Sequence, residues 1–422
     1  MTELTLPNAL EMTPALARGI KKIPMSFKMA AIALTNIVKG QVYVSLPDGR
    51  AITFKGSQPG KVATLLIKDF AFIKRVLSQG DIGFAEGLMA GEWDTPDLAA
   101  LLEVFSENLD LMPSLMLGGP LWMAINNFRH KFLKKNTKSG SKKNILAHYD
   151  LGNSFYSRWL DSSMTYSSAV YDKDGQDLTT AQMNKYRALA EKVDLKPGQK
   201  VLEIGCGWGG FAEFAAREYG AHVTGVTISN EQHIYATERL EAAGLTALTD
   251  IQLIDYRDIQ GEFDAVVSIE MFEAVGEQYW ATYFDKVNAV LKPGGKAALQ
   301  IITIDERLFD EYRTRADFIQ SYVFPGGMLP TVPRLQSEVE RAGLVWGHAA
   351  AFGISYADTL AVWAKNFLAE WLHIRDLGFD ERFRQLWRFY LAYCEAGFRT
   401  GRIDVSHFSM AKPSASFALQ NR

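Results

Sequence analysis

Ten residues in the middle of the chain, VLEIGCGWGG (201–210), constrain the fold more than any other segment. They combine an apolar strand, a glycine-rich turn and the first residues of a helix. Glycines in such a turn allow the backbone to approach a ligand closely. This order of strand, turn and helix is typical of an α/β sheet with crossover helices, which we predict here.

The residues from 145 onward alternate between strand and helix patterns. Two segments, 209–218 and 231–243, have the apolar spacing of helices. We therefore predict one parallel α/β domain over 145–422. The predicted strands are HVTGVTI (222–228), DIQLID (250–255), FDAVVSI (263–269) and KAALQIITI (296–304).

The N-terminal part has a different pattern. Residues 41–54 alternate apolar and polar side chains around Pro-Asp-Gly, which predicts a β-hairpin. Residues 70–77 and 98–105 have helical spacing, and Asp-Thr-Pro-Asp (94–97) is a helix start. These features predict a smaller α+β domain over 1–128.

A block of seven basic residues without an acid lies between the two domains, over 129–143. The apolar stretch 111–128 precedes it, and its prolines and glycines argue against a membrane span. Apolar segments beside clustered Lys and Arg adsorb to anionic lipids. We expect 129–144 to be a linker that contacts the membrane surface, with a merely solvated linker as the alternative. The basic residues are Arg129, Lys131, Lys134, Lys135, Lys138, Lys142 and Lys143.

Overall composition excludes several classes of protein. At about 100–200 residues per domain, 422 residues predict two or three domains. The formal charge of −3 offers nucleic acid no general attraction, and the N-terminus lacks the pattern of a signal peptide. The two cysteines, Cys206 and Cys394, predict neither a disulfide framework nor a metal site. We expect a cytoplasmic protein, peripheral on the membrane.

The end of the second strand distinguishes two classes of cofactor. A dinucleotide site needs an acid there for the ribose, but the chain has Thr227, Ile228 and Ser229. The E-x-G-x-G-x-G pattern from Glu203 instead resembles the S-adenosylmethionine loop of class I methyltransferases, and KPGG (292–295) matches a later turn of that fold. The resemblance implies a Rossmann-like class I methyltransferase domain that uses S-adenosylmethionine.

Further motifs extend the resemblance over nearly the whole chain. Together they resemble the cyclopropane-fatty-acyl-phospholipid synthase family. That resemblance implies methylene transfer from S-adenosylmethionine to the cis double bond of unsaturated phospholipid acyl chains. It also implies a homodimer whose N-terminal domain docks on the membrane. The motifs are GDIGFAEGLMAGEWDTPDL (80–98), HYDLGNSFYSRWL (148–160), MTYSSAVY (164–171), VTGVTISNEQ (223–232), SIEMFEAVGEQYW (268–280), DFIQSYVFPGGMLP (317–330) and YCEAGFRTGRIDV (393–405).

The implied chemistry needs a dry pocket with aromatic walls. An alkene is a weak nucleophile, and its methylation leaves a carbocation that water would quench. Aromatic faces stabilise a cation without trapping it covalently. Each aromatic residue is individually more typical of core packing. The candidates in the motifs are Tyr149, Phe155, Tyr166, Phe272, Tyr322, Phe324 and Tyr356.

A base must then remove a proton, and the family gives this role to a bound bicarbonate ion. By motif position, its ligands would be Glu273, Tyr356 and the backbone of Ile302. Two positions depart from the family pattern, because Ser168 replaces a cysteine and Gln300 replaces a histidine. Glutamine can bind an anion but cannot carry a positive charge, so bicarbonate is a candidate and the identity of the base stays open.

A second acid, Glu270, lies three residues before Glu273 and on the same face of any helix there. Glu270 could be a hydrogen-bond acceptor beside the cofactor or a charge in contact with solvent. We expect Glu273 to be the anchor of the anion or the base itself, since a lipid pocket would desolvate it and raise its pKa.

The resemblance also implies the cofactor contacts. In this chain Gln232 would take the ribose role usually given to an acid. Cys394 occupies a position proposed as catalytic in the family, although methyl transfer to an alkene needs no protein nucleophile. The implied contacts are Tyr166, Ser167, Gly205, Gly207, Thr227, Ile228, Gln232, Tyr256 and Arg257.

Three alternatives stay open. Loss of a proton from the transferred methyl group closes a cyclopropane ring, whereas loss from a chain carbon gives a methyl-branched alkene. A class I methyltransferase acting on another small molecule is the next hypothesis. A lipid-binding protein without activity would tolerate damage to the glycine loop, which is intact in this sequence.

Overall fold

The structure is a computed structural model that describes residues 6, 8–112 and 151–414. The chain divides into two compact units. The first comprises 1–132, 314–323 and 371–401, and the second comprises 133–313, 324–370 and 402–422. The division therefore differs from the boundaries expected from the sequence, because two later segments join the N-terminal domain. The predicted linker 129–144 and nearly all of the apolar stretch 111–128 lie outside the described residues.

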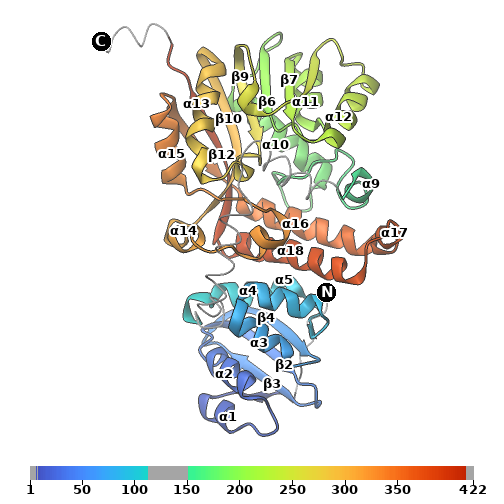
Figure 1. Cartoon of the computed structure of the whole chain (residues 1–422), viewed down its shortest axis with the longest axis vertical. Helices are drawn as coiled ribbons and strands as arrows, with labels where there is room; N and C mark the ends of the chain where they lie inside the picture. The colour runs from blue at the N-terminus through green and yellow to red at the C-terminus, as the bar shows by residue number, and fades with distance from the viewer. Residues whose placement is uncertain (1–5, 7, 113–150, 415–422) are drawn as a thin grey trace. The chain divides into compact units, whose positions relative to one another are not determined.

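The first unit contains a mixed sheet in the order β1-β3-β2-β4-β5, with helices packed on it (Figure 1). The predicted hairpin is confirmed: β2 pairs antiparallel with β3 across a turn in which Gly49 has φ +87°. Asp97 caps α5 by accepting a hydrogen bond from the backbone of Ala100 at 2.9 Å. The elements are β1 (Leu10–Glu11), α1 (Pro14–Gly19), α2 (Met25–Leu34), β2 (Lys39–Ser45), β3 (Ala51–Lys55), β4 (Gln58–Ile67), α3 (Ala71–Gln79), α4 (Asp81–Met89), β5 (Trp93–Asp94), α5 (Leu98–Glu107), η5 (Ile319–Val323), α17 (Trp371–Asp376) and α18 (Glu381–Arg399).

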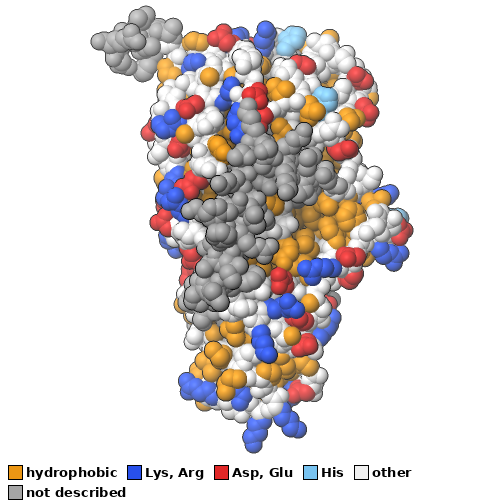
Figure 2. Space-filling model, viewed as in Figure 1, with side chains coloured by type: hydrophobic (Ala, Val, Ile, Leu, Met, Phe, Trp, Pro, Cys, Tyr) orange, Lys and Arg blue, Asp and Glu red, His pale blue; other side chains and the backbone are white. Residues whose placement is uncertain are grey.

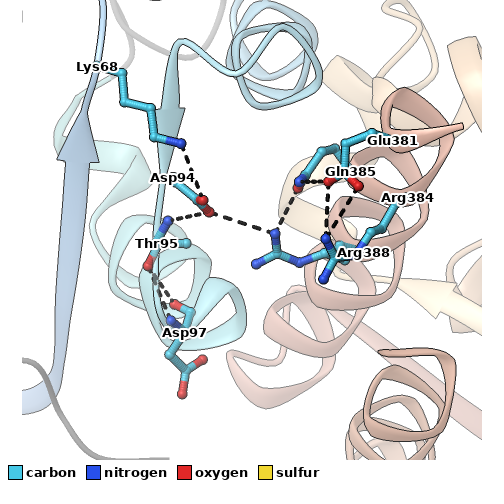
Figure 3. Close-up of polar contacts among 8 residues, drawn as sticks. All are labelled: Lys68, Asp94, Thr95, Asp97, Glu381, Arg384, Gln385 and Arg388. Carbon is cyan, nitrogen blue, oxygen red and sulfur yellow. Dashed lines mark hydrogen bonds and ion pairs between the residues drawn. The ribbon is translucent and has the colours of Figure 1, made fainter. Parts of the chain in front are cut away.

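Helix α18 packs against α4 and α5, which explains why residues 371–401 belong to the first unit. The ring of Phe389 lies 6.2 Å from that of Phe84 and 4.7 Å from that of Phe318. Figure 3 shows the polar edge of this contact, where Arg388 lies 3.7 Å from Asp94. A partly exposed ion pair of this length contributes at most about 1 kcal/mol, so the aromatic packing dominates.

Segment 314–323 is attached to the first unit through Asp81. Both carboxyl oxygens of Asp81 are bound, one by the guanidinium of Arg315 and the other by the backbone N–H of Phe318 at 3.2 Å. The hydroxyl of Tyr393 on α18 lies 3.4 Å from the second oxygen. One acid on α4 thus links both late segments to the N-terminal sheet and its helices.

The second unit contains a sheet in the order β11-β12-β10-β9-β6-β7-β8. The five strands β8, β7, β6, β9 and β10 are parallel, as predicted, while β12 runs antiparallel to β10 and to β11 at the edge. The strand order reverses at β6, between β7 and β9. Ligands of such sheets bind in the crevice at that reversal, beyond the carboxyl ends of the strands. The strands are β6 (Lys200–Ile204), β7 (His222–Thr227), β8 (Thr249–Leu253), β9 (Phe263–Ile269), β10 (Leu291–Ile304), β11 (Val345–Ala351) and β12 (Ile403–Ala411).

Alternating side chains of the central strands enter two separate apolar clusters. Leu202 packs with α13 and α15, whereas Val201 packs with α10, α11 and α12. Successive side chains of a strand point to opposite faces of the sheet, and helices cover both faces (Figure 1). This is the Rossmann-like architecture that the sequence predicted. The helices are α9 (Asn153–Tyr156), α10 (Leu178–Lys192), α11 (Gly210–Tyr219), α12 (Asn230–Ala242), α13 (Trp280–Val290), α14 (Glu306–Tyr312), α15 (Val332–Arg341) and α16 (Gly353–Ala369).

Within the described ranges, none of the helices combines the length and the apolar character needed to cross a bilayer.

Candidate active site

The glycine loop follows β6 at the point where the strand order reverses. Gly205, Gly207 and Gly209 have φ of +83°, +52° and +81°, which side chains with a Cβ rarely adopt. A Cβ on Gly205 would lie 2.7 Å from the side chain of Met271, whereas a Cβ on Gly207 would meet no atom within 4 Å. The loop is therefore closed toward Met271 and open at Gly207, as a cradle for a closely bound ligand requires.

Two further features of this crevice fit S-adenosylmethionine. Thr227 donates to the side-chain oxygen of Gln232 at 2.8 Å, so the amide nitrogen of Gln232 is the group left for a ligand hydroxyl. Glu203 on β6 is buried, its Oε2 has no hydrogen-bond partner among the described residues, and burial raises the pKa of this carboxyl well above its usual value. Ile228 is half-buried directly after β7.

The turn after β8 holds the other pair of expected cofactor residues. The guanidinium of Arg257 binds both oxygens of Asp255, at 2.7 and 2.6 Å. Arg257 also lies over the ring of Tyr256, 5.5 Å from its centroid. The arginine thus fixes the turn, which leaves the face of Tyr256 as the more direct candidate for contact with an adenine ring.

A carboxylate centre lies directly after β9. Glu270 accepts hydrogen bonds at Oε1 from the backbone N–H of Ser168 (2.8 Å) and the amide of Gln300 (2.7 Å). Its Oε2 accepts from the hydroxyl of Tyr356 at 2.6 Å. From the sequence we expect Glu270 to be a solvated charge or a cofactor-side acceptor. The structure instead brings three of the expected anion-site residues onto its carboxylate.

Glu273 lies next to this centre but binds differently. Its Oε1 accepts from the backbone N–H of Ile302 at 2.5 Å, as the motif comparison implied. Its Oε2 is shielded from solvent and has no partner among the described residues. Burial, assisted by the negative charge of Glu270, raises the pKa of Glu273 to about 8. Tyr356, expected to serve the Glu273 site, binds Glu270.

The secondary structure explains how these side chains meet. Gln300 and Ile302 are two residues apart on β10 and so point to the same face. Tyr356, Thr359 and Trp363 follow a helical face of α16, and Thr359 accepts a hydrogen bond from the backbone of Ala169 at 3.1 Å. That bond fixes the loop containing Ser168 against α16.

Two buried basic residues, His407 and Lys185, lie near the carboxylate centre. His407 on β12 lies opposite Gln300 in the antiparallel register, and its Nε2 donates to the amide oxygen of Gln300 at 2.8 Å. Burial lowers the pKa of His407 to about 3, so the ring is neutral. Lys185 on α10 donates to Ser167 Oγ (2.7 Å), and burial lowers its pKa to about 7, opposed by the charge of Glu270.

An aromatic cluster in the same unit adjoins the expected lid residue Tyr166. The Tyr166 ring lies 5.5 Å from Trp159 and 5.4 Å from Trp363, and Tyr356 lies 6.1 Å from Trp363. Phe155 belongs to the cluster through Trp159, at 5.8 Å. These rings pack against one another and are the candidates for aromatic faces that could stabilise a cation.

Other expected residues lie elsewhere. Phe272 packs in the core cluster around Trp280 and Tyr283, in agreement with the simpler packing interpretation. Tyr322 belongs to the first unit and donates to Glu86 at 2.6 Å, and half-buried Cys394 lies on α18 of that unit. Phe324 is half-buried in the second unit, and Tyr149 lies outside the described residues.

Sequence reasoning missed the roles of Glu270, Lys185, His407, Trp159 and Trp363. The presence of an acid at the third position of the motif SIEMFE, before Glu273, was the only available signal for Glu270. His407 reaches Gln300 only through the pairing of β10 with β12, which no local pattern reveals.

Comparison with known proteins identifies the family of this chain. The family model of mycolic acid cyclopropane synthetase matches residues 136–408. Tuberculostearic acid methyltransferase UfaA1 of Mycobacterium tuberculosis is 36% identical over 94% of this chain and 95% of its own. Cyclopropane-fatty-acyl-phospholipid synthase of Escherichia coli K12 is 38% identical over 84% of this chain and 88% of its own.

Solved structures agree with the fold. Mycolic acid cyclopropane synthase CmaA1, complexed with SAH and CTAB, superimposes with a TM-score of 0.61 at 29% identity, covering 64% of this chain and 98% of that chain. The motifs, the strand order, the glycine loop and these similarities agree with one another. The chain belongs to the mycolic acid cyclopropane synthetase family and is an S-adenosylmethionine-dependent methyltransferase that modifies lipid acyl chains.

Proposed function

We propose that this enzyme methylates the cis double bond of unsaturated acyl chains in membrane phospholipids and forms cyclopropane chains. The observation that carries the proposal is the carboxylate centre of Glu270 and Glu273, which follows β9 directly beside the glycine loop of β6. Met271, between these acids, contacts Gly205 and so joins the two sites. A base beside a methyl-donor site is the arrangement that methylation followed by proton loss requires.

In this mechanism S-adenosylmethionine, when bound, supplies the methyl group as a sulfonium. Gly205, Gly207, Thr227 and Gln232 would hold it in the crevice, with Tyr166 and Ser167 covering one side. The cluster around Trp159 and Trp363 would exclude water and face the cation on the acyl chain. A carboxylate then takes the proton whose loss completes the product.

A second product is favoured by one observation. The carboxylate of Glu270 binds three of the donors that the family resemblance assigned to bicarbonate, whereas the backbone N–H of Ile302 binds Glu273. A base on a different atom can take a different proton, and loss from a chain carbon would give a methyl-branched alkene. The bicarbonate expected from the sequence remains a separate prediction, tested below.

We further propose that the enzyme is a homodimer in the cytoplasm and binds membranes peripherally. Support comes from the surface of α1 and α2, where Met25 and Met29 are 71% and 56% exposed. Lys21 and Lys22 lie between the two helices, and Lys28 lies on α2. Figure 2 shows apolar and basic side chains together at this end of the first unit. An apolar surface rimmed by lysines fits an anionic bilayer.

Mass spectrometry would test the product. The purified enzyme is incubated with monounsaturated phospholipid vesicles and cofactor deuterated at its methyl group. Retention of two deuterium atoms means that the methyl group lost one, as cyclopropane closure requires. Retention of all three in an unsaturated product means that the chain lost the proton and identifies a methyl-branching enzyme. Unmodified acyl chains would contradict both.

A further inference from the structure

We propose that Glu270 is a built-in anion that replaces the exogenous bicarbonate and acts as the base of the reaction. This inference rests on the proposed function, because it assigns the proton-removing step of that reaction. It also predicts an enzyme that works without bicarbonate.

The hydrogen bonds of Glu270 carry the inference. The backbone of Ser168, the amide of Gln300 and the hydroxyl of Tyr356 all donate to its carboxylate, over 2.6 to 2.8 Å. Ser168, Gln300 and Tyr356 occupy three of the five positions at which the resemblance places bicarbonate ligands, and Glu273 and Ile302 occupy the other two. A carboxylate and bicarbonate share a planar pair of oxygens, so the side chain satisfies these donors itself.

One acceptor position of Glu270 remains for a proton. A carboxylate has about four acceptor sites, and three are used here, two at Oε1 and one at Oε2. Oε2 therefore keeps one site besides its bond to Tyr356. The residue as a whole is half-buried.

The backbone of Glu270 is strained, as is common for residues at functional sites. Its φ is +48°, in the left-handed region that non-glycine residues seldom adopt, and a residue held there costs about 1–3 kcal/mol. A bond from its N–H to the carbonyl oxygen of Gln300, at 2.9 Å, holds this conformation. The strain is maintained by the same strand that binds the carboxylate.

The groups around Glu270 and Glu273 affect the ionisation of the two carboxyls differently. Glu273 has one hydrogen bond to its carboxyl group, and burial favours its neutral form. Burial also raises the pKa of Glu270, but Tyr356, Ser168, the nearby Lys185 and Gln300 all act in the opposite direction. Of the two acids, Glu270 is the one with three hydrogen-bond donors on its carboxylate, and these donors stabilise the ionised form that a base must have.

The proton-removing step conserves atoms, electrons and charge. A C–H bond of the cationic acyl chain breaks, and its electron pair forms either the third bond of the cyclopropane ring or a C=C bond. The proton passes to Oε2 of Glu270, which becomes a neutral carboxylic acid. The cation and the carboxylate therefore give two neutral products, and no oxidant or metal takes part.

Three forms of the enzyme test this assignment in buffer freed of carbon dioxide. We expect the wild type to keep its rate without bicarbonate. Glu270→Gln keeps the shape but cannot accept the proton, so its rate should fall about 100-fold or more. Glu270→Gly suits the backbone angle and leaves the three donors open, so millimolar bicarbonate or formate should restore its lost rate about tenfold or more.

Asp194→Gly is the matched control, because exposed Asp194 has a similar φ of +52°. It should leave the rate unchanged. Calorimetric binding of S-adenosylmethionine and thermal unfolding show whether each variant is folded. The inference is overturned if the wild type needs bicarbonate, if Glu270→Gln keeps the wild-type rate, or if folded Glu270→Gly is not rescued. A folded wild type that binds S-adenosylmethionine but modifies no acyl chain would instead overturn the proposed function.

Discussion

The ionisation of the Glu273 carboxyl makes the stability of the second unit depend on pH. Its ordinary pKa is 4.5, and burial, with the charge of Glu270, raises it to about 8 in the folded protein. Between these values the folded state holds a proton that the unfolded state has lost. The free energy of unfolding contributed by this group therefore falls as the pH rises from about 4.5 to about 8.

We expect Glu273→Gln to remove this contribution, since glutamine has a similar shape and no charge. Denaturation curves between these pH values should show a smaller loss of stability toward alkaline pH than in the wild type. Glu218→Gln, on the exposed end of α11, is the control and should leave the slope unchanged. An unaltered slope for Glu273→Gln would contradict the raised pKa.

His407 is a positioning residue, because it acts through Gln300. Its Nε2–H binds the amide oxygen, which directs the amide nitrogen toward Glu270. His407→Ala should lower kcat about five- to tenfold, the value of one buried hydrogen bond, with KM little changed. His407→Gln keeps a donor and should restore most of the rate. A loss that His407→Gln does not restore would show that His407 matters only for packing.

At the scale of elements, α1 and α2 carry the surface that we propose docks on a membrane. Replacing Met25 and Met29 with Ser should weaken sedimentation with anionic vesicles, because both methionines are exposed and apolar. Neutralising Lys21, Lys22 and Lys28 should flatten the dependence of binding on salt. Unchanged sedimentation of both variants would exclude this surface.

The basic block outside the described residues is tested separately. Neutralising Lys134, Lys135, Lys142 and Lys143 should weaken vesicle binding and reduce its salt dependence. Neutralising four exposed lysines of the second unit instead, Lys173, Lys196, Lys296 and Lys365, controls for the change of net charge.

Local patterns predicted most of the elements. The hairpin of β2 and β3, α5 with its Asp97 cap, and the strands and helices from β6 to α12 lie within a residue or two of their expected positions. The motifs also selected Ser168, Gln300, Ile302 and Tyr356, which the structure brings together around the two acids. These features depend on short spacings, which a sequence displays directly.

Long-range pairing could not be predicted in the same way. The contact of Tyr356 with Glu270 depends on how α16 packs against the loop of Ser168, and that of His407 depends on strand register. The strand β12 itself was not expected. The motif containing Cys394 suggested a place in the catalytic domain, but its helix packs with α4 and α5.

At the scale of the whole molecule, the packing of α18 against α4 and α5 stabilises the first unit. Phe389 is 1% exposed among aromatic neighbours. Phe389→Ala should lower the free energy of unfolding by about 3–5 kcal/mol. Arg388→Ala, which removes the ion pair with Asp94 and a hydrogen bond to Gln385, should cost less, about 1 kcal/mol. Chemical denaturation of the full-length protein measures both, and equal losses would contradict the dominance of aromatic packing.

The interleaving of the two units also sets the order in which the chain can mature. The N-terminal sheet and its helices lack α18 until residue 401 has left the ribosome, nearly 300 residues after α5. At about 5–20 residues per second, that delay lasts from about 15 seconds to about a minute. During this time the apolar sides of α4 and α5 that later receive Phe389 lack their final cover. We therefore expect nascent chains stalled before α18 to bind chaperones at this surface, and the release of residues 371–401 to complete the first unit, shortly before β12 completes the sheet of the second.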